Sequence, residues 1–583
     1  MTERTESGII ISLGTNCKSR EETHKQKDKE PWCDMQQNEK KTTAGLALRL
    51  TEDGSGYEVY GIGDAVESDI YIDKAEDGLP IQKIVQRAFN RCDRITSVTL
   101  GESVRIVEWY AFTDAKNLTS FKVEGKIDWI SEGAFLRCEA LSFVDLGGAS
   151  EVNFGKYAFR QCTSLTEITI PEGTRYLADG IFLECTSLRK VRSPETLSFF
   201  CDGAFYGCSS LESINIPSHM TGIPTGCFRF CSSLKDITLP EGIQTIWAKA
   251  FDGCHSLEKI NLPFGINQIE EHAFRDCTSL RSVDIPSGIE KMSTGIFSGC
   301  ISITCATFAE GITCVPSEIF SGCTALHSVT LPDSITEISG GAFSGCSSLE
   351  TITLPEALTH ISYGAFKGTS LHEIHFPEGV QLSDGVFRDC ALLESITLPK
   401  CLKKIGDSFF SGCISLSSVK IPEGVESIGN QAFYKCQNLS SLTLPDSLLS
   451  IGESAFEYCK KLTEVHLPKS LKTIGARAFA NCKSLCDLTF PETMEEILEF
   501  AFIGCEALEV VHLPEGIKYL AGGIFMSCSA LRELHVPKSV SSIRGWALNK
   551  CSSLEKLVFK NPIGWGDDAL YSDPRAVAEK FKK

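Results

Sequence analysis

One motif recurs almost without interruption along this chain of 583 residues. Aligned on a phenylalanine, it appears 21 times, with Phe in the units from Phe89 to Phe525 and Leu548 in the last. The spacing is 23 residues, apart from one extra residue between Phe135 and Phe159 and two fewer between Phe366 and Phe387. Periods of about 20 to 50 residues are typical of solenoids, in which each unit contacts only its neighbours. We therefore predict one continuous stack of coils, and not the several globular domains that this length would otherwise suggest.

The consensus I-x-x-x-A-F-x-x-C-x-x-L-x-x-I-x-L-P predicts the path of one coil. In "LTEVHLP" (Leu462 to Pro468), apolar and polar residues alternate, which indicates a short strand with one buried face. The proline lacks a backbone donor and ends that strand. A second extended segment is expected to end in Ala-Phe. The place five residues before the Phe is apolar in all 21 units, so it is predicted to face the core.

The 27 cysteines follow the repeat. Nineteen of them stand three residues after the Phe, and Ala115 and Thr369 take that place in two units. Because Ala and Thr substitute for Cys, this place is predicted to need a small side chain in the core. We therefore predict that its cysteines are reduced thiols that pack in the core. Disulfides and metal binding are the alternatives. Equivalent side chains on stacked strands point in the same direction and not at one another, which disfavours disulfides. No C-x-x-C pair is present, which disfavours a metal site.

A unit such as "IGNQAFYKCQNLSSLTLPDSL" (Ile428 to Leu448) closely resembles the BspA-like, or Treponema-type, leucine-rich repeat. The resemblance covers residues 84–561 and implies a β-rich solenoid. That solenoid would be a right-handed leucine-rich-repeat superhelix of about 21 coils of 23 residues with short parallel strands. It also implies a role in adhesion or protein binding, frequently on cell surfaces, with host matrix proteins or other microbes as ligands. It brings no catalytic residues and no cofactor.

The two ends depart from the repeat. Residues 1–43 mix charges without periodicity and are predicted to be a disordered tail. Residues 44–83 are similar to the entry segment of such proteins, and Asp53-Gly54 with Gly56 predicts an N-terminal β-hairpin cap. Residues 562–583 are predicted to form a C-terminal cap with a short helix, with Ser572 as its N-cap and Pro574 in its first turn.

Charge and hydropathy exclude some partners. The formal net charge of −19 argues against nucleic acid and against an anionic membrane surface. No run of 18 apolar residues is present, so no transmembrane segment is predicted. Neither a signal peptide nor an anchor is visible, which favours a cytoplasmic location, whereas the resemblance implies a cell-surface or secreted protein. The oligomeric state is left open.

The outward residues of the predicted strands indicate where a ligand would bind. Four residues after the conserved Leu, Thr is the commonest residue and predominates in the middle of the chain, whereas the last third carries histidines, with Glu two residues earlier in three units. The predicted ligand-binding face comprises His375, Lys420, Thr443, Glu464, His466, Thr489, His512, Glu533 and His535. His512, His535 and Glu533 are also a weak candidate for a metal site or a surface that titrates near pH 6. The simpler interpretation is a row of solvated strand residues.

No motif points to catalysis. G-x-x-x-x-G-K-[ST], H-E-x-x-H and G-x-S-x-G are absent, and Cys305 and Cys314, which stand outside the cysteine repeat, have no identifiable partner base. The predicted function is a non-enzymatic binding protein that recognises a protein or glycan ligand, such as a host matrix protein. The alternative is an intracellular protein-interaction scaffold.

Overall fold

The computed structural model describes residues 40–559 and 564–565. The chain divides into two units, Met1–Lys40 and Lys41–Lys583, and the second contains nearly all of the described residues. It is a β-solenoid of about 22 turns, with parallel strands and about 23 residues per turn, and its described residues contain no helix. The predicted solenoid and its period are confirmed. Residues 1–39 of the predicted tail and the predicted helix after Ser572 lie outside the described residues.

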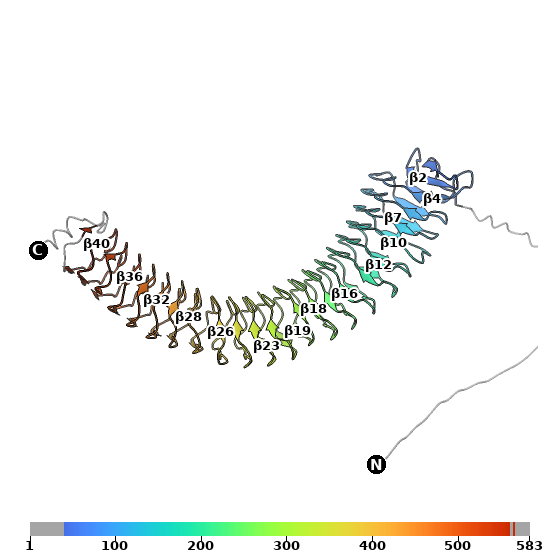
Figure 1. The fold of residues 1–583 in the computed structure, drawn as a ribbon. Coiled ribbons are helices and arrows are strands. Elements are labelled where there is room, and N and C mark those ends of the chain that lie inside the picture. The colour runs from blue at the N-terminus through green and yellow to red at the C-terminus, as the bar shows by residue number, and fades with distance from the viewer. Residues whose placement is uncertain (1–39, 560–563, 566–583) are drawn as a thin grey trace, which may run out of the picture. The chain divides into compact units, whose positions relative to one another are not determined.

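Most coils pass through two strand positions (Figure 1), and neighbouring strands at the same position pair in parallel, in several separate runs along the solenoid. The first strand follows the conserved Leu, and its central residue is apolar. These strands form the first ladder: β3 (Asp69–Ile72), β5 (Ser97–Leu100), β7 (Ser120–Val123), β9 (Phe143–Asp145), β11 (Glu167–Thr169), β13 (Lys190–Arg192), β15 (Ser213–Ile214), β19 (Ser282–Ile285), β21 (Cys305–Phe308), β23 (Ser328–Thr330), β27 (Ser395–Thr397), β29 (Ser418–Lys420), β31 (Ser441–Thr443), β33 (Glu464–His466), β35 (Asp487–Thr489), β37 (Val510–His512), β39 (Glu533–Val536) and β41 (Lys556–Phe559).

The second strand position precedes the Phe motif, and most of its strands have two residues, one outward and one in the core. These strands form the second ladder: β2 (Tyr57–Gly61), β4 (Ile81–Ile84), β6 (Ile106–Val107), β8 (Trp129–Ile130), β10 (Asn153–Phe154), β12 (Tyr176–Leu177), β14 (Phe199–Phe200), β16 (Gly222–Ile223), β17 (Thr245–Ile246), β18 (Gln268–Ile269), β20 (Lys291–Met292), β22 (Cys314–Val315), β24 (Glu337–Ile338), β25 (His360–Ile361), β26 (Gln381–Leu382), β28 (Lys404–Ile405), β30 (Ser427–Ile428), β32 (Ser450–Ile451), β34 (Thr473–Ile474), β36 (Glu496–Ile497), β38 (Tyr519–Leu520), β40 (Ser542–Ile543) and β42 (Gly564–Trp565).

At the N-terminal end, β1 (Ala47–Leu50) pairs antiparallel with β2, as the Asp53-Gly54 turn predicts. Gly54 has a φ of 68°, which a residue without Cβ adopts at little cost. β2 and β3 already pair in parallel with β4 and β5. Solenoid pairing thus begins before Ile84, which adds a turn to the 21 counted from the motif. That this hairpin serves as a cap stays a prediction.

The Ala-Phe segment differs from the expected second extended piece. Ala432 and Phe433 lie in consecutive tight turns after β30, and the backbone is left-handed at Gln431 (φ 55°) and Lys435 (φ 61°). The amides of Gln431, Phe433 and Lys435 donate to carbonyl oxygens of the next coil at 2.7–2.8 Å. The amides between them bond within the turns. The prediction of an extended segment was wrong here. Every second backbone amide forms its hydrogen bond inside a turn, so the segment is not a strand of a ladder.

Phenylalanine rings run through the core as one unbroken stack. The 20 motif phenylalanines are at most 1% exposed, and neighbouring ring centroids are 5.0–6.0 Å apart. The apolar residue five places before the Phe is buried in every unit except at Met292, which is partly buried. The predicted inward positions are therefore confirmed.

The nineteen cysteines that stand three residues after the Phe position form what we call the cysteine ladder. All 25 cysteines among the described residues are free thiols. Eighteen ladder thiols donate a hydrogen bond to the Phe carbonyl of the preceding coil, with Sγ···O distances of 3.0–3.3 Å. The cysteine is therefore both a small core side chain and a weak donor that links neighbouring coils, and its second role was not foreseen from the sequence.

An acidic side chain is held between two arginines in the turns after Phe228, Phe251 and Phe274. Asp252 is fully buried; its carboxylate accepts hydrogen bonds from Arg229 Nε at 2.8 Å and from Arg275 Nε at 2.9 Å. The two arginines come from the coils on either side, so this carboxylate joins three coils.

We expect Asp252→Ala to lower the free energy of unfolding by about 3 kcal/mol, because two partly buried guanidinium groups lose their shared partner. The matched control is Asp128→Ala, since Asp128 also takes two hydrogen bonds from one arginine, Arg105, but both side chains of that pair are more than 40% exposed. Its cost should stay within about 1 kcal/mol. Urea denaturation of both variants measures the difference, and equal costs would show that burial of Asp252 has no energetic consequence.

Candidate functional site: the exposed face of the first ladder

The first ladder presents two columns of side chains to solvent. In β33, Val465 points into the core, while Glu464 and His466 on either side of it are exposed. The same pattern recurs in most first-ladder strands, because successive side chains of a strand point to opposite faces. We call the outward residues of the first ladder the first-strand face.

The structure places eight of the nine predicted site residues in first-ladder strands. Lys420 pairs with Thr443, His466 with Thr489, and His512 with His535, each in register between neighbouring strands. Glu464 and Glu533 occupy the other outward column. Parallel pairing in register therefore brings these residues into two short rows on one surface.

His375 is the exception. It is exposed but belongs to no strand, and no first-ladder strand is assigned between β23 and β27 among the described residues. Its coil is the one that is two residues shorter, with one residue missing between Thr369 and Leu371. The amide bonds linking this segment to its neighbours, from His372 to Glu350 and from Glu394 to His372, are long at 3.4 Å. The prediction that His375 lies on a ladder strand was wrong, and the deletion alone does not explain this, since Thr353 in the preceding coil of regular length also belongs to no strand.

The two histidines of β37 and β39 lie against each other. The rings of His512 and His535 are stacked with centroids 4.1 Å apart. His535 Nε2 contacts the Glu533 carboxylate, and Lys556 Nζ lies 2.5 Å from the same carboxylate. Hydrogen bonding to Lys556, and then to His535, lowers the pKa of Glu533. Glu533 thus has a cation as its main partner already.

This arrangement gives no support to a metal site. Within residues 40–559 and 564–565, no group of three or more His, Cys, Asp or Glu side chains is arranged to hold a metal ion. We therefore do not carry the metal hypothesis for His512, His535 and Glu533 further. Their assignment, with the other residues, to a ligand-binding face stays a prediction.

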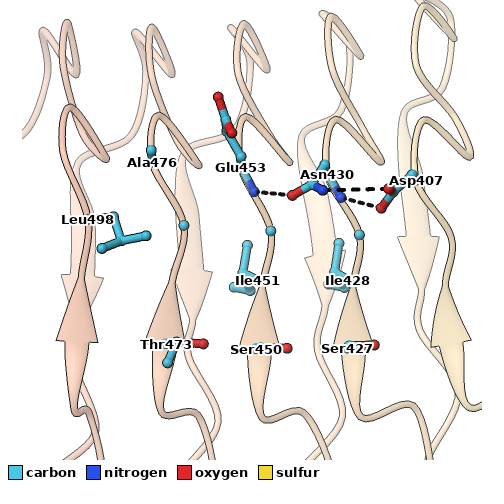
Figure 2. A pocket seen from close by; sticks show the side chains of 13 residues that line it. Asp407, Ser427, Ile428, Asn430, Ser450, Ile451, Glu453, Thr473, Ala476 and Leu498 are labelled. Carbon is cyan, nitrogen blue, oxygen red and sulfur yellow. Dashed lines mark hydrogen bonds between the residues drawn. The ribbon is translucent and has the colours of Figure 1, made fainter.

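A groove on the second ladder was not anticipated from the sequence. It has a volume of about 480 Å³ and is lined by residues of β30, β32 and β34 and of the segments that follow the strands from β28 to β36 (Figure 2). The side chain of Asp407 accepts from the amide of Asn430, and that of Asn430 accepts from the amide of Glu453, both at 2.8 Å. The row of polar side chains along the groove thus bonds to backbone.

Glycine forms the floor of this groove. A Cβ at Gly452 would lie 2.7 Å from the backbone of Asn430 and Gly429, so glycine allows neighbouring coils to approach closely. The signal in the sequence was Ile-Gly at the same place in four consecutive units, from Ile405-Gly406 to Ile474-Gly475. Close packing of coils explains the groove, and we assign no ligand to it.

A profile of the BspA type leucine rich repeat region matches residues 76–152, 152–281, 267–394, 380–497 and 449–573. Since these matches cover most of the sequence, the chain belongs to the BspA-type leucine-rich repeat family. No curated protein matches it.

Among solved structures, the chain is similar to a leucine-rich repeat protein of Bacteroides ovatus, with 22% identity and a TM-score of 0.33 over 81% of this chain and 94% of that one. It is also similar to a leucine rich cell surface protein of Faecalibacterium prausnitzii, with 21% identity and a TM-score of 0.26 over 90% and 95% of the two chains. Scores this low carry no argument about function. Nor does the described part of the chain contain any helix with the length and apolar character needed to cross a membrane.

Proposed function

We propose that this protein is a non-enzymatic binding protein whose first-strand face recognises a protein or glycan ligand, in adhesion or in interaction with a host. The observation that carries the proposal is the register of the outward residues within three strand pairs, β29–β31, β33–β35 and β37–β39. The stacked core rings hold the coils, and with them these side chains, in fixed rows. The conformational entropy of ordering the face is therefore lost on folding and not on ligand binding. Repeat proteins use such extended surfaces for binding.

The residue types on the first-strand face indicate that its C-terminal third is the part that binds the ligand. From β19 to β23 its outward residues are largely Ser, Thr and Asp, whereas from β29 to β39 they include Lys420, His466 and His512. Imidazole and ammonium groups make directional contacts with carboxylates and carbonyls that a row of hydroxyl groups does not.

The test is binding of residues 44–583 to immobilised host matrix proteins, followed by variants in the rows. His466→Ala combined with His512→Ala should weaken binding at least tenfold, because each replacement removes a polar contact in the same column. Thr307→Ala with Thr330→Ala, in the same column of β21 and β23, is the matched control and should leave binding unchanged. If both pairs behave alike, or if no matrix protein binds, the proposal fails.

The second candidate is an intracellular scaffold for protein interactions. The free thiols of all 25 described cysteines favour it, because disulfides are rare in reducing compartments. Labelling of intact cells of the source organism with a membrane-impermeant reagent discriminates between the two. Labelled protein supports the surface role, and recovery only from the cytosol supports the scaffold.

A further inference from the structure

Exposed aromatic side chains gather on the second ladder, away from the first-strand face. The outward residue of the two-residue strand is aromatic in β8 (Trp129), β12 (Tyr176) and β14 (Phe199). From β17 to β40 of the described chain, the only aromatic ring at that place other than the imidazole of His360 is Tyr519, and the guanidinium of Arg544 covers it at 3.8 Å from its centroid. Aromatic residues are thus concentrated over a few consecutive coils.

Two of these side chains, Tyr176 and Phe199, together with Trp247, which directly follows β17, make up what we call the aromatic platform. The rings of Tyr176 and Phe199, on paired strands, have centroids 6.0 Å apart. In the next coil the outward place is Gly222, and a Cβ there would collide with the indole of Trp247. Trp247 of the following coil therefore lies back over the glycine and continues the row.

The platform remains open to water. Phe199 is 51% exposed and Trp247 is 38% exposed, although one side of the indole rests on the Gly222 backbone. The row follows the direction in which coils stack, at about 4.8 Å per coil. It is therefore a narrow apolar strip, one side chain wide and four coils long.

Polar groups beside the platform suit a neutral ligand. Thr221 and Gln244, just before β16 and β17, are exposed, and their side chains make no hydrogen bond within the described residues. Among the nearby charges, Lys156 pairs with Asp179 at 2.7 Å and Arg175 with Glu151 at 3.9 Å, while Asp202 and Lys249, the one acidic and the other basic, lie on the coils of Phe199 and Trp247. Two hydrogen-bonding side chains thus stand free next to an apolar strip without a large excess of either charge.

We propose that the aromatic platform binds a linear, neutral polysaccharide. The apolar C–H faces of pyranose rings pack on Trp247 and Phe199, and sugar hydroxyls bond to Thr221 and Gln244. This ligand matches the strip in width, in direction and in charge, and the site is independent of the first-strand face.

Two other ligands fit less well. Single-stranded nucleic acid also stacks on aromatic side chains, but its sites add a groove of unpaired positive charge, which this strip does not have. A protein partner buries about 800 Å² on each side, and three partly exposed aromatic side chains offer less than half of that. The platform is too small to be the centre of a standard protein interface.

The experiment uses the full chain in native gels cast with hydroxyethylcellulose, xylan or glucomannan as probes. We expect retardation by at least one of them and at least a tenfold loss of affinity in Phe199→Ala and in Trp247→Ala. Gly222→Ala should weaken binding too, because it displaces the indole without removing it. Tyr363→Ala, an aromatic residue that is 59% exposed on another coil, is the control and should bind normally.

Thermal unfolding of each variant shows whether it is folded, and Gly222→Ala keeps the test valid if Trp247→Ala unfolds. The proposal is overturned if none of the three polysaccharides retards the protein. It is also overturned if binding survives Phe199→Ala and Gly222→Ala, or if only heparin or a single-stranded oligothymidylate binds.

Discussion

The protein is expected to unfold in mild alkali, within the window from about pH 8.5 to about 11, because its cysteine ladder must stay protonated to remain buried. Burial raises the pKa of seventeen of the nineteen ladder thiols, to about 11 for Cys390 and to about 12 for Cys346 and Cys551. In an unfolded chain a thiol titrates near 8.5. Between these values the unfolded state releases protons that the folded state keeps.

The sign follows from this difference. The stabilisation is complete below the unfolded-state pKa and is lost as pH rises toward the folded-state pKa. Each thiol then lowers the free energy of unfolding by about 1.4 kcal/mol per pH unit. Because the ladder repeats the same group in coil after coil, the contributions accumulate, and urea midpoints should fall steeply from pH 8 to pH 10 under reducing conditions.

A variant with five neighbouring thiols replaced by alanine isolates the effect from that of other groups: Cys413, Cys436, Cys459, Cys482 and Cys505. Ala115 occupies the ladder place in another coil, where it is fully buried and the adjacent phenylalanine rings keep their 5.1 Å stacking, so alanine fits there. The variant is less stable at pH 7, but its stability should depend less steeply on pH, in proportion to the thiols removed. An unchanged pH dependence would mean that the thiols do not control alkaline unfolding.

The second large effect is expected for Phe456→Ala, which should lower the free energy of unfolding by about 3–5 kcal/mol. Phe456 is fully buried between Phe433 and Phe479, with ring centroids at 5.0 Å and 5.1 Å. Its removal leaves a cavity and takes away both ring contacts. In a solenoid each coil is stable only through its neighbours, so the loss acts on both interfaces of the coil.

The control for this prediction is Thr443→Ala on the first-strand face, one coil before. Thr443 is exposed, so its replacement should change stability by no more than about 0.5 kcal/mol. Chemical denaturation followed by circular dichroism measures both variants. A larger effect for Thr443→Ala than for Phe456→Ala would reverse the assignment of inside and outside.

Much of the fold was predictable because the repeat states the same local pattern 21 times. The alternation around Val465 is a property of a strand with one buried face, and it correctly placed Glu464 and His466 outward. Invariant spacing then placed equivalent residues in register. At His375 the same reasoning failed. No strand is assigned there or at Thr353 in the preceding coil of regular length, so the motif alone does not decide where the backbone of neighbouring coils forms ladder bonds.

The sequence by itself determined the solenoid, its period, its core positions and the columns of the first-strand face, since all of these follow from periodicity along one chain. Only the tertiary structure decided the hydrogen bonds from the cysteine ladder to Phe carbonyls, the place of Asp252 between Arg229 and Arg275, and the indole of Trp247 over Gly222. These contacts join atoms of different coils. They depend on the directions of individual side chains and on a spacing between coils defined to a few tenths of an ångström. The periodicity of the sequence specifies neither of these.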